Sequence, residues 1–441
     1  MRGFLIPLAA SALAACTESP VTPPSGGGGC RYLGPDEDPA APPPPGPDAN
    51  CVVVATINPL SGALGAVGLA LENAARLAVR DVNAAGGVGG KKLCLVACDD
   101  QTDSATGRPI AQELLDKYPI VAVNGAAASA VSLQVSSVLA PRGVPQISCC
   151  STSPELSQIP ELFRTVPSDA LQGVALAAVA RGLSPPADRV AVIYVDDSYG
   201  ASLSGVFREA FAIATGTVTA ALPYRPGASS YTDVIAHALA QDPRHVLLIA
   251  FPTEGAQILR DWRDSGLRPD LAWLATDGLK DDKFAQGAAG LALGTIGTAP
   301  LLTGAHYASF EARYKAAFGG EAPGIFTSNQ YDAMILIALG IQRAGASASP
   351  SAIKDAIQEA ARAPGSMVSA DDVAAALARA AAGDVDYSGA SGELEMDEHG
   401  DVISDYSVWQ VDGTSIVDRP ECWACAQSAG GVRCQEEARC R

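Results

Sequence analysis

Apolar residues along this chain follow two alternating patterns. Continuous apolar runs of strand length, the first of which is CVVVATI at 51–57, are typical of strands buried on both faces of a parallel sheet. Between such runs, apolar residues recur at helical spacing, as Val67, Leu71 and Ala78 do after the first run. Strands that alternate with helices in this way predict an α/β fold built on doubly wound parallel sheets.

The alternation starts afresh after Ser168, so we expect two α/β units of similar size. The first unit is expected to contain strands at 51–57, 93–98, 120–124 and 145–147, and helices at 65–85, 106–118 and 129–139. The second is expected to contain strands at 190–195, 218–222, 246–251 and 271–275, and helices at 168–181, 202–214, 231–240 and 254–265. Helices at 307–318, 327–343, 351–361 and 370–382 and short strands at 393–396 and 404–411 complete the body.

The N-terminal residues have the features of an export signal. A short apolar run follows Arg2 and ends in small residues immediately before Cys16, as in bacterial lipoprotein signals, and it is too short to span a bilayer. We expect residues 1–16 to be a signal peptide region that leaves Cys16 as the lipid-bearing N-terminus, with a plain cleaved signal as the alternative. The Pro- and Gly-rich segment 17–50 cannot bury enough apolar surface to fold and is predicted to be a tether.

Length and charge narrow the classes of partner. The chain has 441 residues, which suggests two domains, and a formal net charge of -18. Nucleic acids and anionic membrane surfaces are bound by basic proteins, so the acidic balance argues against both. Contact with a membrane is therefore expected through the lipid anchor alone.

The cysteines favour disulfides over metal binding. The chain has 11 cysteines, which leaves an even number once Cys16 is set aside, and export favours disulfides. Cys51 and Cys94 begin the first two predicted strands and could face each other. Four more cysteines crowd the C-terminal segment: Cys422, Cys425, Cys434 and Cys440. Their spacing has some likeness to a zinc site, but no histidine stands near them, so we expect disulfides and no metal.

The stretch 143–156 is the first candidate for a ligand site. A short apolar strand there empties into consecutive small polar residues, and Pro154 forces the residue before it away from helical geometry. In open α/β sheets, ligands bind at the carboxyl ends of the strands. The alternative is an ordinary loop whose serines and threonines make local turn bonds.

Short motifs in a fixed order resemble the type I periplasmic substrate-binding proteins, and in particular the branched-chain amino-acid (Leu/Ile/Val) binding members that serve ABC transporters. The resemblance covers roughly residues 51–418. Its motifs are Ile57-Asn-Pro-Leu-Ser-Gly62, Asn83-Ala-Ala-Gly-Gly-Val-Gly-Gly90, Cys98-Asp-Asp-Gln101, 148–156, Phe163-Arg-Thr-Val-Pro-Ser-Asp169, Val195-Asp-Asp-Ser-Tyr-Gly200, Gln257-Ile-Leu-Arg260 with Gly266-Leu267, Thr276-Asp-Gly278, and Gly389-Ala-Ser-Gly392 with Gly400-Asp401. The resemblance implies two lobes that close over a small ligand and a hinge that the chain crosses near Val166, near Thr298 and in the last strands.

The resemblance also implies which residues hold the ligand. Ser129 matches a position that binds the ligand carboxylate, and a hydroxyl at a helix N-terminus suits an anion. Thr152 and the backbone around Cys150, with Ser151 between them, match positions that hold the ammonium and carboxylate groups. Asp277 matches the carboxylate that pairs with the ammonium. A plain helix cap at Ser129, turn bonds in the loop and a structural salt bridge at Asp277 are the alternatives.

Two further positions bear on the ligand head group and side chain. Tyr199 matches a tyrosine near the head group, for which a core or surface tyrosine is the alternative. Phe251 stands where related proteins often carry tyrosine, so a hydroxyl is lost, and Val67 stands where they often present an aromatic ring. These departures suggest an aliphatic or uncharged ligand side chain. The adjacent Cys149 and Cys150 are unusual in a ligand loop, and a disulfide from one of them to Cys98 is an open possibility.

The domain organisation follows from the resemblance. We expect lobe 1 to comprise 51–166 and 299–388, lobe 2 to comprise 167–298 and 389–418, and a Cys-rich tail to follow at 419–441.

The function predicted is that of an exported lipoprotein, facing the periplasm or cell exterior, that captures an amino acid or related amide and presents it to an ABC permease. A sensor or protein-interaction module with the same fold is the alternative, which the long tether and the Cys-rich tail leave open. Catalysis is not expected, because the four histidines lie in separate segments and no nucleophile elbow, phosphate loop or zinc-protease helix is present. No cofactor is expected.

Overall fold

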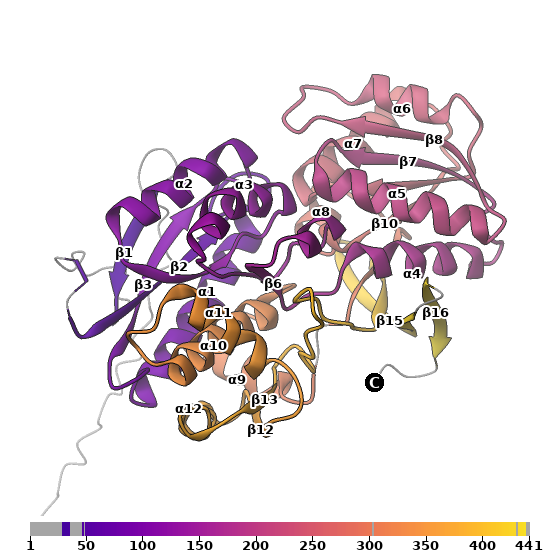
Figure 1. Ribbon diagram of the computed structural model, residues 1–441. Coiled ribbons are helices and arrows are strands. Elements are labelled where there is room, and N and C mark those ends of the chain that lie inside the picture. The colour runs from indigo at the N-terminus through magenta and orange to yellow at the C-terminus, as the bar shows by residue number, and fades with distance from the viewer. Residues whose placement is uncertain (1–28, 36–45, 48, 302–303, 429–430, 438–441) are drawn as a thin grey trace, which may run out of the picture.

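The computed structural model describes residues 29–35, 46–47, 49–301, 304–428 and 431–437. These residues form two lobes, each built on its own large sheet with helices packed against it, which confirms the predicted fold class (Figure 1). The predicted signal peptide, Cys16 and most of the predicted tether lie outside the described residues. None of the described helices is both long enough and apolar enough to cross a membrane.

Lobe 1 is built on a six-stranded sheet in the order β1-β3-β2-β4-β5-β6, parallel except for β1. Its strands are β1 (Cys30–Gly34), β2 (Cys51–Asn58), β3 (Lys92–Asp99), β4 (Ile120–Gly125), β5 (Gln146–Ser148) and β6 (Leu162–Arg164). Its helices are α1 (Gly65–Ala84), α2 (Ser104–Lys117), α3 (Ser129–Leu139), η1 (Ala140–Arg142), η2 (Pro154–Gln158), α9 (Tyr307–Ala317), α10 (Thr327–Ala344), α11 (Pro350–Ala360) and α12 (Val373–Ala382). A small parallel sheet of β12 (Ser366–Ser369) and β13 (Val385–Ser388) lies beside α12.

Both faces of the lobe 1 sheet are covered, as the continuous apolar runs require. Val53 and Ile57 of β2 pack in the same cluster as residues of α2 and α3, whereas Val52 and Val54 pack in the cluster of α1 and α10. Helix α10 lies deep in the lobe, and every side chain from its start to Ile341 is buried. This packing on both faces fixes the positions of the carboxyl ends of the strands, which is where ligands bind in open α/β sheets.

Lobe 2 is built on an eight-stranded mixed sheet in the order β16-β15-β14-β11-β10-β9-β7-β8. Its strands are β7 (Arg189–Val195), β8 (Thr217–Tyr224), β9 (His245–Ile249), β10 (Ala272–Ala275), β11 (Ile296–Pro300), β14 (Tyr406–Asp412), β15 (Ser415–Ser428) and β16 (Gly431–Glu437). Its helices are α4 (Asp169–Gly182), α5 (Ser198–Ile213), α6 (Thr232–Leu239), α7 (Pro252–Ser265), η3 (Asp277–Leu279) and α8 (Asp282–Gly287). The expected short strand at 393–396 does not form, whereas β6 and β11 were not predicted.

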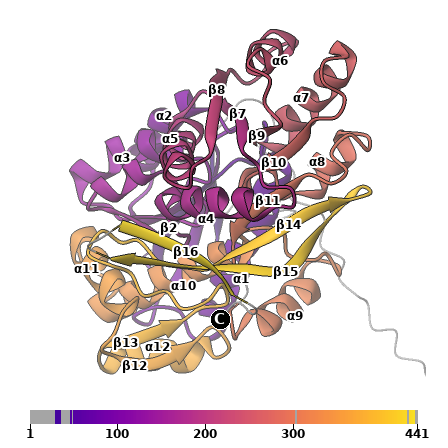
Figure 2. The same cartoon turned by 90° about the vertical axis from the view of Figure 1, so that its right-hand side faces the viewer.

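The C-terminal segment is part of lobe 2 and not a separate tail. Strands β15 and β16 form an antiparallel hairpin that extends the sheet from β14 (Figure 2). Its inner residues Trp423 and Cys425 pack against Leu171 and Ala175 of α4. The disulfide expected in this segment is confirmed between Cys425 and Cys434. Apolar contact with α4 explains why the segment orders against the sheet.

Part of the predicted tether is also ordered. Strand β1 pairs antiparallel with β3 at the edge of lobe 1, and a disulfide joins Cys30 to Cys98. The prediction of a tether over 17–50 is therefore wrong for the β1 segment, because pairing and a covalent link supply the stabilisation that its composition lacks.

The remaining cysteine predictions have mixed outcomes. The expected pairing of Cys51 with Cys94 is confirmed. A disulfide from Cys98 to the ligand loop is wrong, since Cys98 pairs with Cys30 and the two loop cysteines, Cys149 and Cys150, pair with each other.

The predicted lobe boundaries need two corrections. Segment 389–405 belongs with lobe 1, because the carboxylate of Asp332 in α10 accepts hydrogen bonds from the backbone N–H groups of Ala390 (2.9 Å) and Ser391 (2.8 Å), and Met396 and Val402 lie in the lobe 1 core. Strand β11 carries lobe 2 through Pro300, past the expected boundary at 298.

Candidate ligand-binding site

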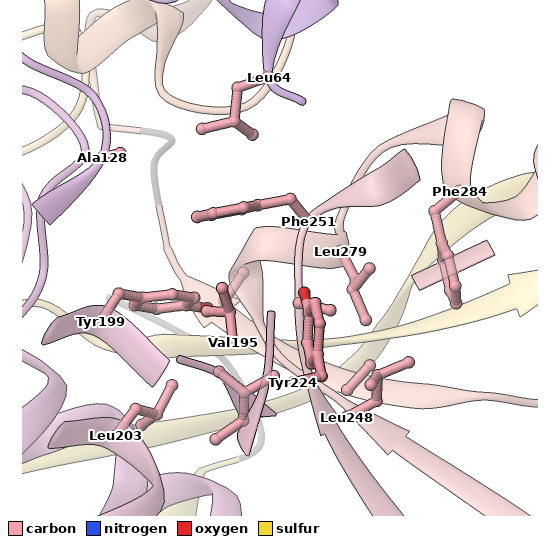
Figure 3. Close-up of a cluster of buried hydrophobic side chains, with 14 of the residues drawn as sticks. Leu64, Ala128, Val195, Tyr199, Leu203, Tyr224, Leu248, Phe251, Leu279 and Phe284 are labelled. Atoms are coloured by element: carbon pink, nitrogen blue, oxygen red, sulfur yellow. The ribbon is translucent and has the colours of Figure 1, made fainter. Parts of the chain in front are cut away.

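A narrow cavity lies between the lobes, at the carboxyl ends of the strands. Figure 3 shows Leu64 and Ala128 of lobe 1 facing Phe251 and Tyr199 of lobe 2. The residues that line the cavity are Leu64, Val67, Ala127, Ala128, Ser129, Cys150, Tyr199, Phe251, Asp277, Gly278, Lys280, Asp281, Ile325 and Phe326. Of the predicted site residues, the structure thus brings together Ser129, Cys150, Tyr199, Phe251 and Asp277.

The cavity itself is small in this arrangement of the lobes. It holds about 40 Å³, little more than the roughly 30 Å³ share of a water molecule. Pockets for small molecules hold about 300–1,000 Å³. The hydroxyls of Ser202 and Ser153 meet across the cleft at 3.3 Å. An amino acid can therefore enter only if the lobes move apart.

Ser129 presents a donor group from the lobe 1 side. It is the first residue of α3. Its N–H group is therefore one of the backbone donors that have no partner within the helix. Its hydroxyl oxygen accepts a hydrogen bond from the backbone N–H of Ser153 (3.2 Å). The hydroxyl proton can therefore be donated to an anionic group in the cavity, where the helix dipole also favours negative charge.

Ser151 and Thr152 lie behind the cavity wall and do not line it. The hydroxyl of Ser151 donates to backbone carbonyl oxygens of the loop that leads into α3, those of Ala126 and Ala127 (both 3.0 Å). The hydroxyl of Thr152 donates to the carboxylate of Asp169 (2.9 Å). Their side chains thus hold the loop through contacts with residues distant in the sequence, which are not the local turn bonds of the alternative.

Cys150 lines the cavity with its side chain, and its backbone N–H is oriented away from a ligand. That N–H donates to the hydroxyl of Ser148 (3.3 Å), as does the N–H of Ser151 (3.0 Å). These two N–H groups were expected to donate to the ligand carboxylate, but in this arrangement they are already bonded to Ser148. Ser129 at the N-terminus of α3 is therefore the better donor.

The lobe 2 wall is formed by two stacked rings. The rings of Tyr199 and Phe251 lie with centroids 5.8 Å apart and planes 14° from parallel. Tyr199 lies in the first turn of α5, which begins at Ser198, earlier than the predicted 202, because the side chain of Asp197 caps the helix. Phe251 stands just after β9 and before α7. The stack is a flat apolar surface facing lobe 1.

Asp277 places a negative charge at the end of β10, where it opens η3. It is 4% exposed, and its carboxylate accepts a hydrogen bond from the Tyr199 hydroxyl (2.9 Å). The same hydroxyl lies 2.8 Å from that of Thr276. Burial raises the pKa of Asp277, although hydrogen bonds from Tyr199 and Gln172 oppose the rise. Among the described residues, the ionised carboxylate therefore has no neighbouring cation that offsets the cost of its burial.

Asp169 is a second buried acid that the sequence analysis did not assign to the site. Burial and the neighbouring charge of Asp277 raise its pKa well above the usual range, and one of its carboxylate oxygens, Oδ1, is buried without a hydrogen-bond partner. Asp169 is the last residue of the motif 163–169, one of the motifs on which the family resemblance rests. The motif alone could not predict that Asp277, much later in the chain, lies close to it. Two acids in one buried region favour a cationic group between the lobes.

Three large apolar wall residues were also missed. Leu64 precedes α1, and Ile325 and Phe326 precede α10. Phe326 has a positive φ of 63°, a conformation that L-residues with large side chains rarely adopt and that is often found at ligand sites. Helical periodicity could not reveal these residues, because each stands in a loop just outside the helix that it precedes.

Comparison with known proteins agrees with this geometry. The family model described as periplasmic binding protein matches residues 52–415. The chain belongs to the periplasmic binding protein family. Members of this family are extracytoplasmic binding proteins, and the relatives place the chain in the type I, branched-chain amino-acid group that the motifs predict.

Three relatives show how far the similarity extends. A Leu/Ile/Val-binding protein homologue from Brucella melitensis is 28% identical over 70% of this chain and 83% of its own length. The substrate-binding protein BasB of a chemotactic signal transduction system in Halobacterium salinarum is 25% identical over 83% of this chain and 89% of its own length. The crystal structure of the leucine-binding protein LivK from Thermotoga maritima shares the fold, with a TM-score of 0.72, 24% identity, and coverage of 83% of this chain and 97% of LivK.

Proposed function

We propose that this chain is an extracytoplasmic solute-binding lipoprotein that captures an amino acid or related amide between its lobes and presents it to an ABC permease. The observation that carries this proposal is the placement of Ser129 and Asp277 on the two sides of one apolar cavity. A hydroxyl at a helix N-terminus suits a carboxylate, and a buried carboxylate suits an ammonium group. A zwitterion has both groups.

The apolar wall supports a ligand with an aliphatic or uncharged side chain. Apart from the polar groups at its ends, the cavity is lined by Leu64, Val67, Phe251, Ile325 and Phe326. A charged side chain placed against these apolar residues would lose its hydration, which costs several kcal/mol, unless it reached Lys280 or Asp281, which also line the cavity. Relatives named as Leu/Ile/Val-binding proteins support the same ligand class.

The lipid anchor at Cys16 and delivery to a permease rest on the sequence and on family membership. Closure of the lobes around a ligand would create the surface that a permease recognises, since only the closed form aligns both lobes.

A thermal-shift screen tests the proposal. The chain without residues 1–16, with its disulfides intact, is screened against the common L-amino acids and simple amides, and each hit is measured by calorimetry. A ligand at a hundred times its Kd should add about 2.7 kcal/mol to the free energy of unfolding. A shift confined to amino acids with apolar side chains supports the proposal, whereas no shift with any amino acid or amide contradicts it.

A sensor that uses the same fold is the second candidate. It is favoured by the similarity to BasB, which belongs to a chemotactic system, and by the hairpin β15–β16, most of which lies beyond the end of the family match at residue 415. Ligand binding would be common to both functions. Co-purification with a permease or with a signalling receptor from the native membrane distinguishes them.

A further inference from the structure

The ligand loop of lobe 1 contains a disulfide between neighbours in the sequence, Cys149 and Cys150. It follows β5 directly. Thr152 and Ser153 come soon after it, and the N–H of Ser153 donates to the Ser129 hydroxyl. Closing a bond between adjacent side chains forms a small ring that includes the peptide unit joining them, so rotation about the backbone there is restricted.

The disulfide separates the ligand cavity from the lobe 1 core. Cys149 is fully buried in a small apolar cluster with Leu71, Val166 and Phe326, and Cys150 lies partly exposed beside it. Cys150 and Phe326 both line the cavity. Cys150 therefore continues the wall that Phe326 begins, and its bond to the buried Cys149 joins this part of the wall to the core through an apolar and polarisable group.

The loop is anchored on the side that faces the core. The Ser148 hydroxyl donates to the carbonyl of Ala126 (2.6 Å) and accepts from the N–H groups of Cys150 (3.3 Å) and Ser151 (3.0 Å). The remaining freedom of the loop lies in the side chains of the two cysteines and the peptide between them. The disulfide removes that freedom before a ligand arrives, and preorganisation of this kind increases affinity.

We propose that the Cys149–Cys150 disulfide is a specificity-determining part of the ligand site, where it packs against an apolar ligand side chain and restrains the loop whose Ser153 N–H donates to the Ser129 hydroxyl. The inference rests on the proposed function. In the dithiol form the same wall would consist of two thiols on a less restricted loop, and contact with an apolar side chain would be weaker.

The variant Cys149→Ala/Cys150→Ala tests this role, with Cys51→Ala/Cys94→Ala as the matched control. The control also lacks one disulfide of lobe 1, but Cys51 begins β2, whereas the cavity lies beyond its other end at Asn58. Calorimetry measures the Kd of each protein for L-leucine and for L-alanine. We expect the loop variant to bind L-leucine at least about tenfold more weakly, which corresponds to about 1.4 kcal/mol, and to lose less affinity for L-alanine. The control should keep both affinities.

Three outcomes of this experiment would overturn the inference. If the loop variant keeps the native ratio of affinities, the disulfide does not contact the ligand side chain. If the control loses L-leucine affinity equally, the effect reflects general loss of stability. If the native protein binds no amino acid, the proposed function fails and the inference fails with it, so the native measurement separates the two failures.

A second measurement on the native protein does not depend on the variant folding. Dithiothreitol transfers two electrons and two protons to a disulfide, which becomes two thiols, while the reagent becomes a cyclic disulfide. The thiols are alkylated and counted by mass spectrometry, with and without L-leucine. We expect L-leucine to slow reduction of Cys149–Cys150 and to leave Cys425–Cys434 unaffected. Equal rates with and without L-leucine at Cys149–Cys150 would overturn the inference.

Discussion

In the proposed site, Asp277 is the residue that we expect to pair with the ammonium group of the ligand. Its carboxylate is buried and accepts hydrogen bonds from Tyr199 and Gln172, and no basic side chain among the described residues lies within ion-pair distance of it. A buried charge of this kind is costly unless a counter-charge arrives. The ionised Asp277 is therefore expected to be more stable when a cationic group is bound beside it than when the cavity is empty.

We expect Asp277→Asn to weaken binding of a zwitterionic amino acid by at least about 100-fold, because loss of one partner of a buried charge pair costs about 2–5 kcal/mol. Calorimetry of the variant against the ligand found by screening checks this. Asp264→Asn removes an exposed acid from the same lobe and should bind as the native protein does. Near-native affinity in Asp277→Asn would contradict the site assignment.

The same substitution should stabilise the protein in the absence of ligand. Burial raises the pKa of Asp277, so the folded state holds this proton more tightly than the unfolded state does. The ionised carboxylate therefore lowers the free energy of unfolding as the pH rises above the ordinary carboxyl range and through the raised pKa. Urea denaturation at neutral pH should show Asp277→Asn more stable than the native chain, and the difference should disappear in acid. A less stable variant at neutral pH would argue that Asp277 has a structural role.

Ligand affinity should also depend on pH. In the proposed function the ammonium group of the ligand pairs with the ionised carboxylate of Asp277, and burial raises the pKa of both Asp277 and its neighbour Asp169. Affinity should consequently fall as the pH falls through these raised values, and binding should release protons. Calorimetry in buffers of different ionisation enthalpy measures that release. A Kd that is constant across the acid range would contradict it.

At the scale of elements, α10 links the lobe 1 core to the segment that leads back to lobe 2. Asp332 accepts hydrogen bonds from the hydroxyls of Tyr387 (2.8 Å) and Ser391 (2.6 Å), in addition to the two backbone N–H groups that tie segment 389–405 to lobe 1. Gly389 packs against this carboxylate, where a Cβ would lie only 2.4 Å from one of its oxygens. The network fixes one end of the hinge.

We expect Asp332→Ala to destabilise the protein by about 3 kcal/mol or more, because several buried donors lose their acceptor at about 1–3 kcal/mol for each group left unpaired. Equilibrium urea denaturation of the ligand-free chain measures the loss. Asp355→Ala in α11, where the carboxylate is exposed, should change stability by less than about 0.5 kcal/mol. Equal stability of the two variants would show that the network contributes little.

Most elements could be predicted from the local pattern, and the errors have physical reasons. The predicted helix 129–139 coincides with α3, since its serines and apolar residues follow helical spacing without a break. β6, a strand of only three residues, was missed because it is too short to show a period. β1 was missed because it has only five residues and lies in a Pro- and Gly-rich segment, whose composition predicts no regular structure. It pairs with β3, which is distant in the sequence.

At the scale of the whole molecule, the narrow cavity implies that the lobes separate and close. Three chain crossings join the lobes, between β6 and α4, between β11 and α9, and before β14. Contact across the cleft near the cavity includes the hydroxyls of Ser153 and Ser202 and a hydrophobic cluster that contains Leu64 of lobe 1 and Phe251 of lobe 2. Linked lobes of this kind close as hinged bodies around a ligand.

We expect the ligand-free chain in solution to be more open than the structure. Small-angle X-ray scattering should show a radius of gyration that exceeds the value calculated from the closed lobes and that falls when the ligand found by screening is added. Asp277→Asn at the same ligand concentration should remain open, because it lacks the counter-charge that draws the lobes together. A radius that does not change with ligand would contradict closure.

The sequence by itself determined the α/β class and the two-lobed family, because these follow from periodicity and from motifs that are contiguous in the chain. The same motifs pointed to Ser129 and Asp277, which the structure places on one cavity. Only the tertiary structure decided which cysteines pair, that Ser151 and Thr152 lie behind the wall, that Asp169 lies near Asp277, and that the C-terminal hairpin completes the lobe 2 sheet. These features join segments far apart in the chain, or depend on which way a side chain points, and packing alone sets both.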